Sequence, residues 1–176
     1  VLATALVSAV LGVVIERLAY KPLRGGSRLA TLITTIGVSF LLQNLFLLLF
    51  GSSPKPFPNH FTGEGFTVGG VTISRLTATT VLVTVVLMVL LTVFVNRSRA
   101  GKAMRAVSED QGAAQLMGIN IDTSISLTFA IGSAMAAVAA VLYSSTYPLI
   151  NPYMGSMLGL KAFIAAVIGG IGVIPG

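Results

Sequence analysis

Long stretches without a charged residue constrain this chain more than any other feature of its sequence. Uncharged runs cover residues 1–15, 29–54, 76–96, 123–160 and 162–176. A helix needs about 20 apolar residues to cross the hydrocarbon core of a bilayer, and each of the three inner runs reaches that length. Charged residues make up only 9% of the chain, against about 25% in a soluble domain. The sequence therefore predicts an all-α, polytopic transmembrane helix bundle.

Five apolar segments are expected as spans, within a single transmembrane domain over residues 1–176. They lie at about residues 1–16, 29–50, 77–96, 123–145 and 156–174. Val1 already stands in an apolar run, and Gly176 ends a glycine-rich one. We therefore expect an internal fragment that is truncated at both ends.

The positive charges are concentrated in two of the four loops. Eight of the 11 Lys and Arg residues lie there: Arg17, Lys21, Arg24 and Arg28 in one loop, and Arg97, Arg99, Lys102 and Arg105 in the other. Two spans separate these loops, so both can face the cytoplasm, as the positive-inside rule predicts. The loop at 51–76 and the uncharged loop at 146–155 are then external.

Composition excludes several classes of protein. The chain has no Cys, so it has no thiolate nucleophile and no Cys-ligated metal, and its single His, His60, cannot form a metal cluster alone. Gly101-Lys102 is followed by Ala103 and does not complete a phosphate-binding loop. Membrane orientation explains the net charge of +6. We expect no catalytic site, no bound cofactor or metal, and no nucleic-acid partner.

The external loop at 51–76 has a stiff start and a strand-forming end. Three prolines restrict its start: Pro54, Pro56 and Pro58. Residues 66–73 are β-branched or aromatic on both sides of Gly69-Gly70, which predicts a short β-hairpin. Three phenylalanines either pack on the outer ends of the spans or contact a partner: Phe57, Phe61 and Phe66.

Small residues recur at every fourth position of the fourth apolar segment: Gly132, Ala136, Ala140 and Ser144. Helices in membranes associate where small side chains let their backbones approach, so this face is predicted to pack against another helix. The fifth segment carries a similar series: Gly155, Gly159, Ala162, Ala166 and Gly170. The glycines at 169–172 and Pro175 should interrupt its helix, which then either packs on protein or lines a water-filled pathway.

The segment at 101–122 predicts a short capped helix between two spans. Ser108 and Gln111 match a capping box, and Glu109 and Asp110 suit the first turn of a helix. Gly118 suits the position just after its end. The expected helix covers about residues 109–117 and is too short to cross a membrane. It is either a linker at the membrane surface or an element that transmits movement between proteins.

Several blocks of sequence resemble one family of transporters. Gly112-Ala113-Ala114, followed after three residues by Gly118, is similar to the Glu-Ala-Ala-x3-Gly pattern of ABC-importer permeases, with Gly in place of the Glu. The wider blocks are ERLAYKPLR (16–24), TLITTIGVSFLLQN (31–44), RAVSEDQGAAQLMGIN (105–120) and INPYMGSMLGLKAFIAAVIGGIGVIPG (150–176). They resemble the H-type permease of high-affinity branched-chain amino-acid ABC importers.

The resemblance implies a role and partners that composition cannot give. Such permeases lie in the bacterial inner membrane with a second permease, two cytoplasmic ATPases that bind ATP and Mg²⁺, and a periplasmic protein that delivers Leu, Ile or Val. The loop at 97–122 would then be the cytoplasmic coupling loop. The residues expected to couple it to an ATPase are Ser108, Glu109, Asp110, Gly112, Ala113, Ala114, Leu116, Met117 and Gly118.

Five polar residues are candidates for the substrate pathway: Gln43, Asn44, Tyr147, Asn151 and Tyr153. Gln43 and Asn44 should face the bundle, where they either join helices or meet substrate. Lys161 can extend its amine outward from the fifth segment. A permease for a sugar, urea or another amide is an alternative, as is a membrane assembly subunit without a pathway.

Overall fold

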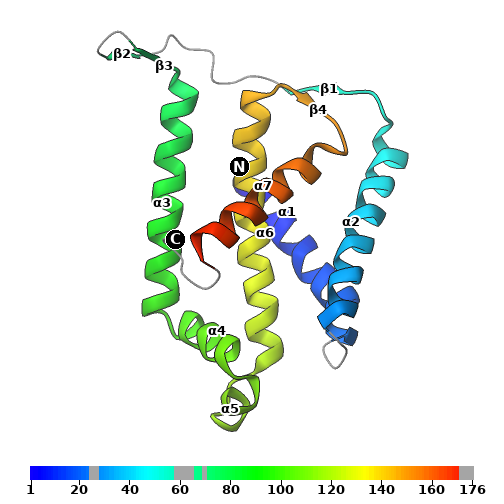
Figure 1. Ribbon diagram of the computed structural model, residues 1–176, viewed down its shortest axis with the longest axis vertical. Coiled ribbons are helices and arrows are strands. Elements are labelled where there is room, and N and C mark those ends of the chain that lie inside the picture. The colour runs from blue at the N-terminus through cyan, green and yellow to red at the C-terminus, as the bar shows by residue number, and fades with distance from the viewer. Residues whose placement is uncertain (24–27, 58–65, 69–70, 171–176) are drawn as a thin grey trace. The chain divides into compact units, whose positions relative to one another are not determined.

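The computed structural model describes residues 1–23, 28–57, 66–68 and 71–170. It is built from helices, with four short strands among the described residues (Figure 1). In chain order the elements are α1 (Leu2–Ile15), η1 (Glu16–Tyr20), η2 (Lys21–Leu23), α2 (Arg28–Phe50), β1 (Lys55–Pro56), β2 (Phe66–Val68), β3 (Val71–Ile73), α3 (Arg75–Arg97), α4 (Arg99–Glu109), α5 (Gln111–Leu116), α6 (Ile121–Thr146), β4 (Leu149–Ile150) and α7 (Met154–Gly169). The predicted fold class is confirmed.

Four helical segments are long and apolar enough to cross a membrane: Leu2–Leu23, Ile33–Phe50, Arg75–Arg97 and Ile121–Thr146. Large apolar side chains are exposed along the first three of them, as lipid-facing surfaces require. The protein is therefore a multi-pass membrane protein, as the uncharged runs predicted.

The fifth predicted span, at 156–174, is wrong in its bounds and its length. Helix α7 begins at Met154 and has 16 residues, which span about 24 Å at 1.5 Å per residue and fall short of a hydrocarbon core of about 30 Å. The helix stops before Gly170, whose φ is 90°. Residues with a Cβ rarely adopt this backbone conformation. The expected interruption by glycine is confirmed at that residue, while Ile171 and the residues after it lie outside the described part.

The first apolar segment extends further than predicted. The chain stays helical through one π-helical turn, η1, and one 3₁₀ turn, η2, up to Leu23. Glu16, Arg17 and Lys21 therefore all lie in helical turns, whereas Arg17 and Lys21 were predicted to lie in a loop. Burial against another helix keeps Glu16 in the segment, because its carboxylate accepts a hydrogen bond there.

Two small antiparallel pairings lie among the described strands. The predicted hairpin is confirmed, with Phe66 paired to Ile73 and Val68 to Val71, while Gly69 and Gly70 lie outside the described residues, as does Phe61. The second pairing joins β1 to β4, with Lys55 opposite Ile150. The N–H of Phe57 extends it by donating to the carbonyl of Pro148 at 2.7 Å. Sequence patterns did not indicate this second pairing.

The chain divides into two compact units. One comprises Val1–Phe50 and Val93–Ala139, and the other comprises Gly51–Thr92 and Ala140–Gly176. The first contains α1, α2, α4, α5 and the first part of α6. The second contains both strand pairings, α7, most of α3 and the last part of α6.

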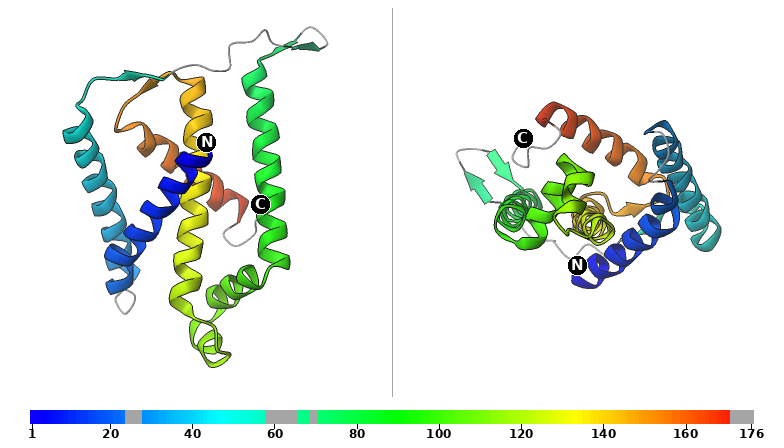
Figure 2. Two further views of the ribbon diagram at one scale, coloured as in Figure 1. Left: turned by 180° about the vertical axis from the view of Figure 1, so that it is seen from behind. Right: turned by 90° about the horizontal axis from the view of Figure 1, so that it is seen from below.

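Helix α1 packs against the first part of α6 within the first unit (Figure 2). Gly12 makes this approach possible, since a Cβ there would lie 2.7 Å from the Cβ of Ser133. The hydroxyl of Ser8 donates to the carbonyl of Ser133 at 2.8 Å. Ala137, one turn further along α6, is buried.

The face of α6 that carries the small-residue series is not the face that packs on α1. Ala136 and Ala140 are exposed, and no atom lies within 4 Å of a Cβ built on Gly132. Ser144 is buried. Helix α1 uses the adjacent stripe through Ser133, and the packing of the small-residue face against another helix stays a prediction.

Candidate functional site

The segment that links α3 to α6 is fixed by a cap at the start of each helix. The Oγ of Ser98 accepts from the N–H of Gly101 at 2.8 Å and caps α4. The Oδ1 of Asn120 accepts from the N–H of Thr123 at 3.1 Å and caps α6. Such caps satisfy backbone donors that a helix start leaves free and typically stabilise it by about 1 kcal/mol. We call residues 98–120 the α4–α5 segment.

The predicted helix at 109–117 is wrong at its start. Asp110 is extended, with φ −150° and ψ 112°, and it separates α4 from α5. Its Oδ1 accepts from the N–H groups of Gly112 and Ala113 at 2.8 and 3.1 Å. Ser108 instead lies in the last turn of α4 and donates to the carbonyl of Arg105 at 2.7 Å. A serine hydroxyl can bond back into its own helix, whereas a carboxylate can only accept, which makes Asp110 the cap.

The end of α5 is the predicted one. Gly118 has a φ of 78°, its N–H donates to the carbonyl of Gln115, and the N–H of Ile119 donates to that of Ala114, both at 3.0 Å. This pair of hydrogen bonds is a Schellman motif, which requires the left-handed backbone that glycine adopts at little cost.

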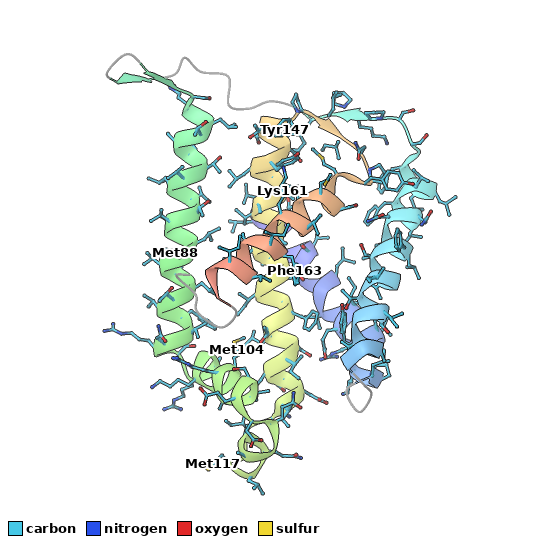
Figure 3. The ribbon with its side chains drawn as sticks, in the orientation of Figure 1. Met88, Met104, Met117, Tyr147, Lys161 and Phe163 are labelled. Atoms are coloured by element: carbon cyan, nitrogen blue, oxygen red, sulfur yellow. The ribbon has the colours of Figure 1, made fainter. Side chains whose placement is uncertain are left out.

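The structure separates the predicted coupling residues into two groups. Ala114 is only 3% exposed and packs inside the protein, while Leu116 and Met117 are 91% and 82% exposed. Met117 lies at the far end of α5 (Figure 3). The other exposed members of the predicted set are Ser108, Glu109, Asp110, Gly112, Ala113 and Gly118. We define the α5 surface as Gly112, Ala113, Leu116 and Met117.

Helix α4 is held tightly against the end of α3. A Cβ on Gly101 would lie 2.6 Å from the carbonyl oxygens of Phe94 and Val95, so only glycine allows this approach. Val107 is buried, and the Nη1 of Arg105 donates to the Oδ1 of Asn96 at 3.3 Å. The α4–α5 segment is thus anchored at both ends and exposes an apolar tip.

Gln43 and Asn44 satisfy hydrogen bonds within their own helix. The Nε2 of Gln43 bonds to the Oγ of Ser39 at 3.3 Å, and the Nδ2 of Asn44 donates to the carbonyl of Phe40 at 2.8 Å. Asn44 is exposed in this chain, and the expectation that it faces the bundle stays a prediction. That expectation assumed that the Asn44 amide needs a hydrogen-bond partner on another helix. The carbonyl of Phe40 on its own helix, α2, accepts this hydrogen bond instead.

Three further pathway candidates lie around β4 in the second unit. The Oδ1 of Asn151 accepts from the N–H of Tyr153 at 3.0 Å, which makes a capped turn before α7. The rings of Tyr143 and Tyr147 are 4.8 Å apart. Tyr147 and Tyr153 are exposed, as is Lys161 on α7 (Figure 3).

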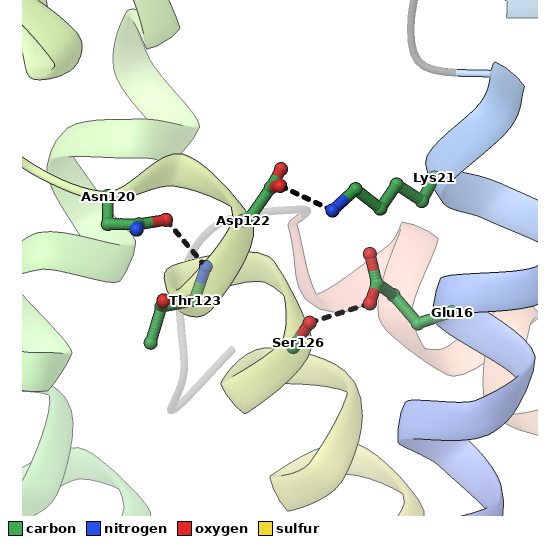
Figure 4. Close-up of polar contacts among 6 residues, drawn as sticks. All are labelled: Glu16, Lys21, Asn120, Asp122, Thr123 and Ser126. Atoms are coloured by element: carbon green, nitrogen blue, oxygen red, sulfur yellow. Dashed lines mark hydrogen bonds and ion pairs between the residues drawn. The ribbon is translucent and has the colours of Figure 1, made fainter.

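One buried acid was not among the predicted site residues. Glu16 is 0% exposed, and the Oγ of Ser126 donates to its Oε2 at 2.6 Å (Figure 4). Close by, the Nζ of Lys21 lies 2.7 Å from the Oδ2 of Asp122 in a half-exposed ion pair. The usable signal was an acid that directly follows an apolar run and precedes further helix-forming residues. Among the described residues, no three His, Asp or Glu side chains gather as metal ligands would.

Comparisons with known proteins place these features in one family. The model of the branched-chain amino acid transport system permease component matches residues 1–176. The chain is 48% identical, over 99% of its length, to the high-affinity branched-chain amino acid transport system permease protein BraD of Pseudomonas aeruginosa, of which it covers 58%. It is 46% identical, over 97% of its length, to the LivH protein of the same description from Salmonella typhimurium, of which it covers 57%.

A more distant relative is named for the import of a different substrate. The autoinducer 2 import system permease protein LsrC of Yersinia enterocolitica is 26% identical over 85% of this chain, which covers 40% of it. No solved structure matches the chain. The chain spans less than two thirds of the length of each of these relatives, and it belongs to the family of branched-chain amino acid transport system permease components.

Proposed function

We propose that this chain is part of the permease subunit of an ABC importer that carries branched-chain amino acids across the bacterial inner membrane. The observation that carries the proposal is the 48% identity to a high-affinity branched-chain amino acid permease over 99% of the chain. Four apolar helical segments supply the membrane-spanning scaffold. ATP and Mg²⁺ would be bound by separate ATPase subunits, since the sequence has no phosphate-binding loop.

The α5 surface is the proposed contact with an ATPase. Leu116 and Met117 are apolar and more than four fifths exposed, which suits an anchor that enters a groove of another protein. Gly112 and Ala113 precede them with almost no side-chain bulk, so a partner can approach the backbone. Ala114 takes no part in this contact, because it is buried in the chain itself.

Movement at α5 would reach the membrane through α6. Only Met117, Gly118, Ile119 and Asn120 separate the two helices, and both helix ends are held by backbone hydrogen bonds. Closure of the ATPases would push α5, and α6 would pass this movement to the other spans. The spans would then switch the substrate pathway between outward-open and inward-open states. A second permease subunit and a periplasmic binding protein would complete the transporter.

The proposed contact is tested by enlarging the α5 surface in the assembled transporter. Ala113→Trp should block close approach, reducing both uptake of labelled leucine and co-purification of the ATPase by about tenfold or more. Thr84→Val on α3 is the matched control, because the Thr84 hydroxyl bonds within its own helix. Normal uptake and ATPase binding in Ala113→Trp, at normal membrane abundance, would make the segment a linker.

The orientation is tested with single cysteines in intact cells. Met117→Cys should be shielded from a membrane-impermeant thiol reagent, and Ser53→Cys should react with it, because the cations at 97–105 favour the cytoplasmic side. Both positions are exposed in this chain, so access and not burial decides the result. Labelling of Met117→Cys from outside would remove the ATPase contact from the proposal.

The second candidate substrate class comes from the more distant relative. The permease from Yersinia enterocolitica is named for autoinducer 2 import, so a related chain can serve another small polar solute. Competition of labelled leucine uptake by unlabelled isoleucine and valine, but not by autoinducer 2, would support the branched-chain assignment. The reverse pattern would replace it.

A further inference from the structure

An acidic side chain is buried inside the first membrane-spanning segment. Glu16 belongs to the segment Leu2–Leu23 and is the largest fully buried side chain among the described residues. Removing a carboxylate from water is unfavourable unless hydrogen bonds compensate for it, so ionisable residues inside spans are rare and usually functional. The function proposed above does not use this residue.

A hydrogen-bond partner of Glu16 lies on α6. The hydroxyl of Ser126 donates to Oε2 of Glu16 at 2.6 Å, a length typical of strong hydrogen bonds to a carboxylate. Glu16 also opens η1, the π-helical turn Glu16–Tyr20. Such turns interrupt a regular helix and often occur at functional positions.

Further contacts continue this hydrogen bond along both helices. Ser8 bonds to Ser133, the rings of Tyr20 and Phe129 are 5.0 Å apart, and Lys21 pairs with Asp122. From Ser8 to Lys21 the partners on α6 change from Ser133 to Asp122, so the two segments run antiparallel. Four contacts along their length hold these two helical segments together. Among the described residues, Glu16 is the only one of the contacting side chains that is fully buried.

The same stretch of α6 begins directly after α5. Asn120 caps α6 two residues after Gly118, and Asp122 and Ser126 lie in its first turns (Figure 4). All of these residues belong to the first compact unit, together with α4 and α5. A displacement of α5 therefore acts first on the part of α6 that Glu16 holds.

We propose that Glu16 is a positioning residue that joins α1 to the start of α6, so that α5, the start of α6 and α1 move as one body. The inference rests on the proposed docking of an ATPase at the α5 surface. Without this joint, ATP hydrolysis would move α5 and α6 but would leave α1 behind. Hydrolysis would then continue with less transport.

The first test measures leucine uptake per ATP hydrolysed in the assembled transporter. Glu16→Leu removes the acceptor and should lower this ratio by about tenfold, and Ser126→Ala should lower it by about threefold. Glu16→Gln keeps an oxygen that accepts from Ser126 and should stay within about twofold of the parent protein. Thr84→Val, whose hydroxyl bonds within α3, serves as the control. A Glu16→Leu transporter with an unchanged ratio would overturn the proposal.

The second test replaces the hydrogen bond by a covalent link. The 176 residues contain no Cys, so paired cysteines can be introduced without background in this chain. Glu16→Cys combined with Ser126→Cys should transport poorly, and a short, membrane-permeant bifunctional thiol reagent should restore the ratio to within about twofold of the parent protein. The same reagent on Glu16→Cys alone should restore nothing.

The cross-linked pair also decides the case in which Glu16→Leu fails to assemble. Restored coupling supports a joint whose two sides move together, whereas a cross-linked transporter that stays inactive shows that the sides must separate and overturns the proposal. Failure of the proposed function is visible without any variant at Glu16. In that case the parent complex takes up no branched-chain amino acid, or Ala113→Trp leaves ATPase binding intact.

Discussion

Two adjacent stripes of α6 differ in what they contact. One stripe, with Ser126, Phe129, Ser133 and Ala137, meets α1 and η1 or is buried. The other carries the regular small series, and its first three members, Gly132, Ala136 and Ala140, are exposed. Small side chains permit close approach, but hydrogen bonds and a glycine on the opposing helix decide which stripe is used within the chain.

The largest expected effect comes from filling the contact stripe at its tightest point. Gly12→Leu would place atoms where Ser133 and the carbonyl of Phe129 now lie, so α1 must move away from α6, at a cost of about 3 kcal/mol. Gly132→Leu is the matched control, because nothing lies within 4 Å of its Cβ position. Thermal unfolding of the purified protein in detergent measures both, and equal losses would erase the distinction between the stripes.

A smaller difference in stability is expected between leucine substitutions at two neighbouring alanines, Ala136 and Ala137. Ala137 is 6% exposed, so Ala137→Leu should destabilise the chain by about 1–2 kcal/mol through overpacking. Ala136 is exposed, so Ala136→Leu should change the stability of the isolated chain by less than about 0.5 kcal/mol.

The same pair of variants sharpens the role of the exposed stripe. If the second permease subunit covers it, Ala136→Leu should reduce co-purification of that subunit while Ala137→Leu at matched abundance does not. Unchanged assembly in Ala136→Leu would leave the exposed stripe facing lipid.

The smallest effect concerns the hydrogen bond at the far end of the contact stripe. Ser8→Ala removes the donor to the carbonyl of Ser133 and should cost about 0.6 kcal/mol, the average for such bonds between membrane helices. Ser8→Thr keeps a hydroxyl and should recover most of this loss. A Ser8→Ala change as large as that of Gly12→Leu would show that polar contacts and not backbone approach hold the pair.

Local chemistry made part of this structure predictable. Uncharged runs located the spans, Gly69-Gly70 located the hairpin and Gly118 located the end of α5, because each depends on neighbouring residues alone. The start of α5 required a choice between two adjacent caps, Ser108 and Asp110. The sequence pattern favoured the serine, whereas its hydroxyl bonds back into α4.

Features that join distant parts of the chain were not predictable in this way. Glu16 stays in a helix because Ser126 lies opposite it, and no local pattern records that neighbour. Asn44 shows the converse, since its polarity suggested a partner on another helix and its own helix supplied one. The role of the α5 surface remains a prediction for the experiments above, and the pathway roles of Tyr147, Asn151 and Tyr153 remain predictions as well.

The pairing of β1 with β4 constrains the order in which parts of the protein fold during synthesis. Its strands are at residues 55–56 and 149–150, so α3, α4, α5 and α6 are all synthesised between them. The ladder cannot begin to form until the ribosome has completed α6, whereas the β2–β3 hairpin needs only residues 66–73. The entropic cost of closing so long a loop for two residue pairs is met only once the intervening spans are already in the membrane. The pairing between β1 and β4 therefore forms late, after α3 and α6 have been inserted into the membrane.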